Sequence, residues 1–344
     1  MGVGGIHMGR HFGADLATND LSDHLTSLAN AAVNGGDMFT VRVVSNTIIS
    51  APTPTTTGGT EEVTFRVKSI LAFHRVAGAD VIIFGMYVHE YGEVGSSVYQ
   101  GRVFIECVDS PPLLHETPGG ERQAALTAIL TGYIQWSASR GFSFLHLHAP
   151  PPQDGAKHIF VLRSLSVRLQ STVHLACWFE KVLSSARQGG YIAGTWSTWC
   201  GDDEDDSSDE STHADSSDLA SDITRKALTA PGVGSAKWQA KHGIFNERYF
   251  MAKLNTPRLR IEQDIPLIPS RLAGRRADLS RFIANERLQF GTLEHAQYTA
   301  MTIARCLALE SRYVQAQQQH QQQQHQQPPG TNPDGTGSVP PALR

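Results

Sequence analysis

Two places in the sequence put polar side chains where a regular element is expected to end or to begin. At the first, Asp109 and Ser110 follow an apolar, β-rich run and precede two prolines, which stop a strand and open a loop at its carboxyl end. At the second, Arg122 stands in the first turn of a helix, directly after Gly119 and Gly120. Backbone N–H groups at a helix start favour an anion, and a guanidinium adds charge-assisted hydrogen bonds. The pattern indicates an anionic ligand, although a lone arginine at a helix start is more often an ordinary surface residue.

Two other groups of residues admit different chemistry. His146 and His148 alternate along a strand and share one face, which is how a metal site can begin, but the sequence offers no third ligand beside them. Cys107, close to Asp109, is a nucleophile only if a histidine lies next to it, and a buried structural cysteine is the commoner role in a strand. The four cysteines form no CxxC pair. We therefore expect neither a metal site nor a disulfide framework.

A sheet and a crossover helix are needed to position these residues. Strand patterns lie at 39–44, 63–73, 81–92 and 101–110, with a loop at 50–60, and the successive strands predict an antiparallel meander at the start of the sheet. A long helical pattern at 121–139 and a strand at 142–148 then predict a parallel crossover. Further elements are predicted as strands at 159–162 and 245–254 and as helices at 21–32, 174–187, 278–285 and 293–313. The predicted fold class is α/β, with a central mixed β-sheet flanked by helices.

The composition limits the class of protein to which the chain can belong. Of its 344 residues 40% are hydrophobic, enough for a substantial core, and no run approaches the roughly 18 apolar residues of a membrane helix. The N-terminus has no signal-peptide pattern, so we expect no membrane partner. The net charge of −4 includes an acidic run at 202–222, and the rest of the chain is mildly basic. That balance suits an anionic ligand and is too weak to predict direct nucleic-acid binding.

Low-complexity stretches divide the chain. Residues 201–236 are predicted to be a disordered acidic insertion, and residues 312–344 a disordered tail of Gln/His repeats followed by Pro and Gly. Residues 1–20 receive no assignment. Residues 21–311 are predicted to form one domain that the acidic insertion interrupts.

Several motifs in order carry a resemblance to a known family. FGMYVHEYG at residues 84–92 and RVFIECVDS at residues 102–110 resemble the acetyltransferase domain of the CREB-binding-protein family of histone acetyltransferases. The likeness continues in ILTGY at 129–133, in Trp178 and in IPLIP at 265–269, and it spans roughly residues 21–311 with gaps. The sequence has no pattern typical of the bromodomain, PHD, ZZ or TAZ modules of that family.

The resemblance implies a fold and an activity. It implies a GNAT-like acetyltransferase core with a loop covering coenzyme A, and transfer of acetyl from acetyl-CoA, without a metal, to lysines of histone tails and other proteins. It also implies transcription-factor partners, a location in the nucleus and a role in transcriptional coactivation. The alternative is a relative with little or no catalytic activity that binds acetyl-CoA or partner proteins as a scaffold.

The resemblance also assigns roles to individual residues. The positions implied to bind the coenzyme are Val108, Asp109, Ser110, Arg122, Gln123, Leu169, His174 and Trp178. The positions implied to take part in catalysis are His148, Trp178 and Phe179.

Four of the matched positions differ from the family. Phe179 stands where the family has a tyrosine thought to protonate the leaving thiolate, and phenylalanine has no proton to give. His148 replaces a tryptophan of the lysine channel, His174 replaces an arginine, and Leu126 replaces a tyrosine. These differences threaten catalysis more than fold. A histidine titrates near neutral pH, so His148 or His174 is the candidate to replace the missing acid.

Overall fold

A seven-stranded mixed sheet forms the centre of the protein. The computed structural model describes residues 12–33, 36–54, 59–92, 99–111, 120–148, 159–160, 172–197, 249–258, 260–262 and 265–326. Its strands are β1 (Phe39–Pro54), β2 (Thr60–Val76), β3 (Ala79–Tyr91), β4 (Arg102–Asp109), β5 (Phe144–His148), β6 (Ile192–Ser197) and β7 (Tyr249–Leu254). They lie in the order β1-β2-β3-β4-β5-β7-β6. Only the β4–β5 pair is parallel among these strands, which confirms the mixed α/β sheet predicted from the sequence.

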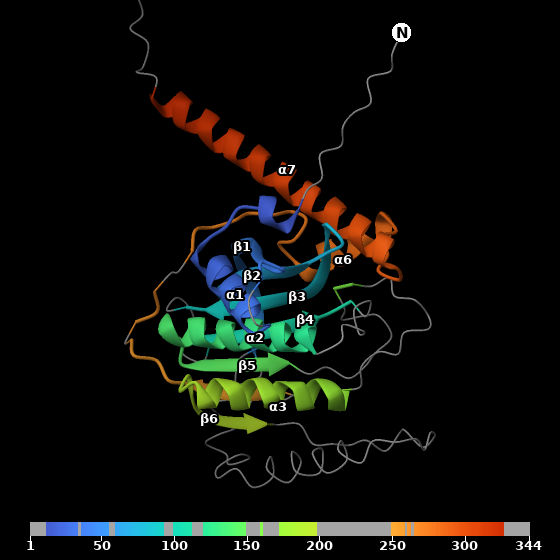
Figure 1. Ribbon diagram of the computed structural model, residues 1–344. Coiled ribbons are helices and arrows are strands. Elements are labelled where there is room, and N and C mark those ends of the chain that lie inside the picture. The colour runs from blue at the N-terminus through green and yellow to red at the C-terminus, as the bar shows by residue number, and fades with distance from the viewer. Residues whose placement is uncertain are drawn as a thin grey trace, which may run out of the picture.

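The helices cover both faces of this sheet (Figure 1). They are η1 (Gly13–Asp15), α1 (Asp20–Ala31), α2 (Glu121–Ser139), α3 (Thr172–Gln188), α6 (Arg276–Asn285) and α7 (Leu293–Gln326). On one face α2 lies between α1 and α3, and the hydroxyl of its Tyr133 donates to Glu90 on β3. Tyr87 is also on β3, but its side chain lies on the opposite face of the sheet from Glu90. There its hydroxyl donates to the carbonyl of Arg275, just before α6. None of the helices among the described residues has the length and apolar character needed to span a membrane.

The crossover between β4 and β5 determines where the candidate site lies. β4 runs into α2 and α2 returns the chain to β5, with Arg102 to Ile105 paired against Phe144 to Leu147. Parallel strands end at the same edge of a sheet, so the ends of β4 and β5 lie on the same side. This edge, next to the start of α2, is where an α/β protein tends to bind its ligand.

Three predicted elements differ from the structure. β1 continues through the predicted loop to Pro54, because its β-branched residues pair with β2 as far as Thr60. Ile159 and Phe160 form a bend rather than a strand. The Gln/His stretch predicted to be disordered continues α7 to Gln326, because the packed first half of α7 nucleates the helix and Gln is a good helix former. The acidic run at 202–222 lies outside the described residues.

The outer edge of β1 is closed by a distant segment of the chain. Asn46 and Ile268 exchange backbone N–H···O hydrogen bonds of 2.9 and 2.8 Å in an isolated antiparallel bridge. The side-chain amide of Asn46 donates to the carbonyl of Pro266 at 2.7 Å. Proline lacks an N–H, so Pro266 and Pro269 on either side cannot extend this bridge into a strand.

A buried ion pair joins the sheet to α2. Lys68 on β2 is fully buried, and its ammonium donates to Glu90 on β3 at 2.7 Å. The same carboxylate oxygen accepts the hydroxyl of Tyr133 at 2.5 Å. Two charges removed from water need such partners, because a buried unpaired charge is strongly destabilising.

We expect Lys68→Met to lower the free energy of unfolding by about 3–5 kcal/mol, because it leaves the Glu90 carboxylate buried without its cation. The double variant Lys68→Met/Glu90→Leu should be less destabilised than Lys68→Met alone, because it leaves no unpaired charge. Urea unfolding measures both. Arg281→Ala, which breaks the exposed pair with Asp278, is the control and should cost about 0.5 kcal/mol or less. A double variant at least as unstable as the sum of the two single variants would contradict this role for the pair.

Candidate functional site

Asp109 closes β4 and holds a second segment against the end of the strand. Its Oδ1 accepts the N–H of Ser110 at 2.8 Å, and its Oδ2 accepts the N–H groups of Ile159 and Phe160 at 2.9 Å each. Gly85 leaves room for this segment, since a Cβ there would lie 2.8 Å from a methyl carbon of Ile159. The buried Asp109 carboxylate thus has a structural role, because it accepts hydrogen bonds from backbone N–H groups at the edge where β4 and β5 end. Val108 before it is partly buried against the core.

Ser110 and Arg122 meet at the same edge. The Ser110 hydroxyl donates to the carbonyl of Ile83 at 2.6 Å. The Nη2 group of Arg122 donates to the Ser110 hydroxyl, and to the carbonyl of Pro111 at 2.5 Å. The start of α2 is therefore fixed to the end of β4 by the two residues that the sequence suggested for anion binding.

The electrostatics of Arg122 leave it charged and incompletely satisfied. Burial lowers the pKa of its guanidinium to about 10, so it is a cation at neutral pH. Its Nε is buried and has no hydrogen-bond partner among the residues that the structure describes. Gly120 is the N-cap residue of α2, two residues before Arg122, and has a left-handed conformation with φ 71°. A buried cation with a spare donor at a helix start is suited to an anion.

Gln123 lines a second feature, an open groove of about 650 Å³ over α2, and Trp178 bonds to another of its residues, Thr127. The Trp178 indole donates to the Thr127 hydroxyl at 3.0 Å, which fixes α3 to α2. Gln123 and Thr127 both line the groove, one helical turn apart. The residues around it are uncharged and come from α1, α2, α3 and the turn after α3: Leu28, Gly120, Gln123, Ala124, Thr127, Ala128, Thr131, Gly132, Gln135, Ser185 and Tyr191.

The remaining predicted residues are dispersed. Phe179 is fully buried, with its ring 5.9 Å from that of Phe250 on β7 and 5.5 Å from that of Trp178. His174 is exposed near the start of α3, and His148 is half-buried at the end of β5. Leu169 lies outside the described residues. The structure therefore brings Asp109, Ser110 and Arg122 together, and it connects Trp178 to α2 through Thr127.

Sequence reasoning missed a charged cluster close to the end of β4. Glu106 lies 3.4 Å from the His89 ring nitrogen on β3 and 3.5 Å from Arg276 on α6. Burial opposes ionisation of the Glu106 carboxyl, but His89 and Arg276 outweigh it and lower its pKa. The three residues are separate in the sequence, so only a Glu among the apolar residues in the middle of β4 hinted at them. Thr127 was missed because a threonine inside a helix carries no signal of its own.

Comparison with known proteins shows a similarity over the middle of the chain. Residues 55–212 match the family model described as histone acetyltransferase domain KAT3. Over this segment the chain is similar to the KAT3 family of histone acetyltransferases. All ten residues assigned to the site by resemblance lie in the KAT3 segment.

Individual relatives align with about a third of the chain or a little more. The chain is 28% identical over 132 residues to protein cbp-1 of Caenorhabditis elegans and 30% identical over 139 residues to histone acetyltransferase HAC12 of Arabidopsis thaliana. It is 31% identical over 130 residues to probable histone acetyltransferase HAC-like 2 of Oryza sativa subsp. japonica. These matches cover 38%, 39% and 36% of this chain. They span only 6%, 8% and 9% of the relatives' own lengths.

The Asp109 contacts can be tested directly. Asp109→Ala removes the acceptor of two buried N–H groups, so we expect a loss of roughly 2–3 kcal/mol of stability. Hydrogen exchange at the amides of Ile159 and Phe160 should accelerate more than exchange in β2. Asp109→Asn keeps one acceptor oxygen and should fall between the parent and Asp109→Ala. Unchanged exchange at both amides would show that another group holds this segment.

Proposed function

We propose that this protein is a histone and protein lysine acetyltransferase that uses acetyl-CoA as its co-substrate. The observation that carries the proposal is the contact of Arg122 with Ser110 and Pro111 at the common edge of β4 and β5. It lies inside the KAT3 segment and joins two motifs that are separate in the sequence. Acyl transfer needs an anion site for the coenzyme and a fixed position for the thioester at such an edge.

The hydrogen-bonding capacity of Arg122 in the structure suits the phosphate groups of acetyl-CoA. Within the described part of the chain, Arg122 retains a buried Nε donor with no hydrogen-bond partner, and phosphate oxygens accept such donors. Ser110 and Val108 offer the hydroxyl and the strand end against which an extended pantetheine arm would lie. Gln123, Trp178, His174 and Leu169 complete the proposed set of coenzyme contacts.

The proposed acceptors are lysine side chains of histone tails and of other proteins. The names of several relatives, which are histone acetyltransferases, support the histone part of this proposal. Action in the nucleus, partnership with transcription factors and a role in coactivation follow from the same kinship. We propose no direct nucleic-acid partner and no membrane partner.

Proton transfer is the step for which the chain departs most from its family. The attacking lysine amine must lose a proton, and the departing thiolate must gain one. Phe179 can do neither, and its ring is enclosed by Trp178 and Phe250. Water, or one of His148 and His174, would then carry the proton. We expect a slow enzyme that acts mainly by positioning its two substrates.

The burial of Phe179 also favours a second candidate function, a scaffold that binds acetyl-CoA without transferring acetyl. Incubation of the purified chain with radiolabelled acetyl-CoA and histones separates the two. Label on histones, lost on adding excess unlabelled acetyl-CoA, supports the transferase. Coenzyme binding by calorimetry with no transferred label supports the scaffold, and the absence of both contradicts the two proposals together.

We expect Arg122→Ala to weaken acetyl-CoA binding by about ten-fold or more, because a charge-assisted contact is lost. Arg122→Lys keeps the charge but not the fork of donors and should have an intermediate affinity. Calorimetry measures each variant, with thermal unfolding to verify its fold. Arg140→Ala, at the other end of α2, is the matched control and should bind as the parent does. Equal affinity of folded Arg122→Ala and parent would remove Arg122 from the coenzyme site.

We expect Phe179→Tyr to raise the rate of acetyl transfer with acetyl-CoA affinity almost unchanged, because positioned acid catalysis contributes about 10²–10⁴ in rate. Phe179 is fully buried, so an unsatisfied hydroxyl would cost about 1–3 kcal/mol of stability. Rates are therefore compared well below the unfolding temperature of both proteins. The companion change His148→Trp should chiefly alter the affinity for the lysine substrate. A flat rate in folded Phe179→Tyr would mean that position 179 does not face the thiolate.

A further inference from the structure

His74 on β2 lies at the same edge of the sheet as Arg122. β2 and β4 are both antiparallel to β3, so these two strands run in the same direction and toward the same edge. Asp109, the last residue of β4, pairs with Gly85, which in turn pairs with Leu71 on β2. Because β2 continues past Leu71, the Cα atom of His74 lies about 10 Å beyond the row in which β4 ends.

The side chain of His74 lies on the face of the sheet that α2 covers. Lys68 on the same strand bonds to Glu90, the carboxylate that Tyr133 of α2 also reaches. Side chains alternate along a strand, so His74, an even number of residues after Lys68, shares that face. Measured from this common anchor, His74 is about 20 Å away along β2, and Arg122 is about 16 Å away along α2 in the same direction. The two rises bring the imidazole and the start of α2 to similar heights above the anchor.

Charged groups of α2 and β3 act on the imidazole of His74, while the ring of Phe39 on β1 stacks on it at 4.6 Å. Burial lowers the pKa of His74 and is the largest influence on it. The Glu121 carboxylate raises this pKa, the Arg122 guanidinium lowers it, and the Asp80 carboxylate raises it. The imidazole is therefore neutral at neutral pH, and a further negative charge beside it would favour its protonation.

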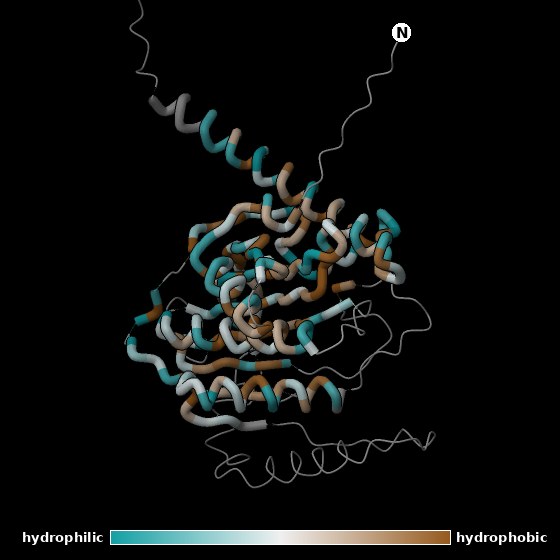
Figure 2. Tube along the Cα trace, in the orientation of Figure 1, coloured by the Kyte–Doolittle hydropathy of each residue, from teal (hydrophilic) through white to brown (hydrophobic). Residues whose placement is uncertain are grey.

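Two buried nitrogen atoms at this edge, Nδ1 of His74 and Nε of Arg122, find no hydrogen-bond partner in the described ranges of the chain. The two residues are only 7% and 8% exposed, and they lie at the end of a central sheet that is largely hydrophobic (Figure 2). A buried polar group without a partner is destabilising, so two such groups mark a place for a ligand or a water molecule. The start of α2 adds its free N–H groups and the positive end of the helix dipole. The combination favours an anion over a water molecule.

We propose that His74 and Arg122 together bind a phosphate group of acetyl-CoA, and that His74 takes up a proton from solvent as the phosphate binds. This pairing depends on the acetyl-CoA site proposed above. A bound phosphate places negative charge next to the imidazole and offsets the effect of the Arg122 guanidinium on it, and both changes favour the imidazolium. The protonated ring then donates a charge-assisted hydrogen bond from Nδ1, beside the donor from Nε of Arg122. A bound water molecule would bring no charge and would cause no proton uptake.

Calorimetry of acetyl-CoA binding to the full chain, in two buffers of different ionisation enthalpy, measures the protons taken up per coenzyme bound. Near pH 6.5 we expect the parent to take up roughly half a proton or more beyond the number taken up by His74→Gln. Because affinity changes about ten-fold per pH unit for each proton taken up, the affinity of the parent relative to His74→Gln should rise several-fold between pH 8 and pH 6. His74→Phe keeps a ring to stack on Phe39 and should behave as His74→Gln does. Thermal unfolding verifies the fold of each variant.

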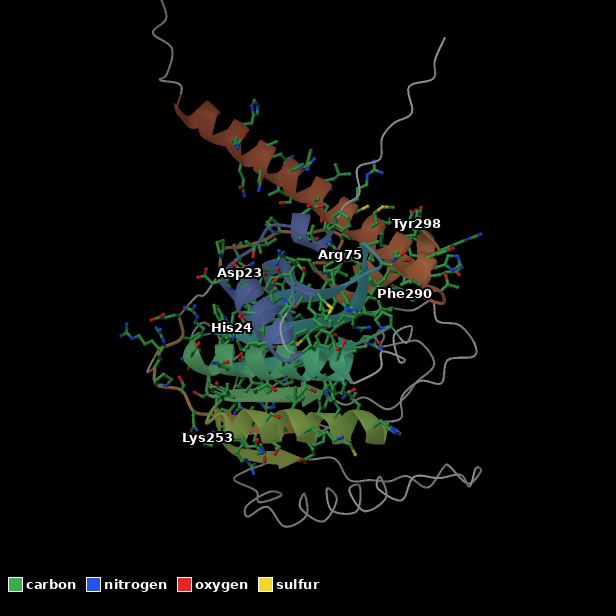
Figure 3. The ribbon with its side chains drawn as sticks, viewed as in Figure 1. Asp23, His24, Arg75, Lys253, Phe290 and Tyr298 are labelled. Carbon is green, nitrogen blue, oxygen red and sulfur yellow. The ribbon has the colours of Figure 1, made fainter. Side chains whose placement is uncertain are left out.

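His24 on α1 provides the matched control. Burial lowers its pKa as well, and its Nε2 is another buried nitrogen atom with no partner within the described segments. Its ring lies 5.6 Å from that of Trp136, near the far end of α2, and apart from Arg75, the residue that follows His74 (Figure 3). His24→Gln should therefore take up as many protons on binding acetyl-CoA as the parent does.

Dephospho-acetyl-CoA, which lacks the phosphate monoester on the ribose, distinguishes the phosphate groups. Uptake that depends on His74 and persists with this coenzyme assigns the contact to the diphosphate, and uptake that disappears assigns it to the monoester. Equal proton uptake by the parent and the folded His74 variants overturns the role of His74 and leaves the acetyl-CoA site in place. A parent that binds both coenzymes without net proton uptake overturns it as well. A parent that binds neither coenzyme overturns the acetyl-CoA site, and this inference with it.

Discussion

The position of α2 depends on one buried carboxylate. Glu90 accepts hydrogen bonds from Lys68 and Tyr133, so it ties two strands and the crossover helix to one point. Tyr133 and Arg122 are 11 residues apart, which is close to three full turns, so they lie on the same face of α2. The contact that holds Tyr133 against the sheet therefore also turns Arg122 toward the end of β4. The geometry of the candidate site is set inside the core, about 16 Å along the helix from the site itself.

Two glycines allow close side-chain packing in this arrangement. A Cβ at Gly132 would lie 2.5 Å from a methyl carbon of Leu28, so a larger residue there would require the Leu28 side chain of α1 to shift. Gly85 plays the same part for Ile159 on the other face. Both glycines belong to the motifs that resemble the family, and both allow packing rather than contact a ligand. The packing around the site thus involves small residues at some distance from it.

The sequence predicts the order of elements well and their contacts poorly. Strand periodicity locates β2, β3 and β4, and the crossover follows from a strong helix between two strands. The extension of β1 beyond residue 44 could not be predicted, because it depends on pairing with β2 rather than on local propensity. The bend at Ile159 depends on a carboxylate 50 residues earlier in the chain. The helical state of the Gln-rich stretch depends on the packed half of α7 before it. At the site, the motifs indicate Asp109, Ser110 and Arg122, but only tertiary structure shows that Arg122 bonds to Ser110 and that Phe179 is enclosed.

The bridge between Asn46 and Ile268 has a consequence for the behaviour of the protein at high concentration. β1 is the terminal strand of the sheet, and an uncovered terminal strand recruits strands from other molecules and so seeds aggregation. The bridge occupies backbone groups in the middle of β1, and the flanking prolines cannot pass the hydrogen-bond ladder onward. A polymer growing from this edge would first have to displace residues 265–269. The segment that resembles the family at IPLIP therefore acts as a barrier to fibre growth.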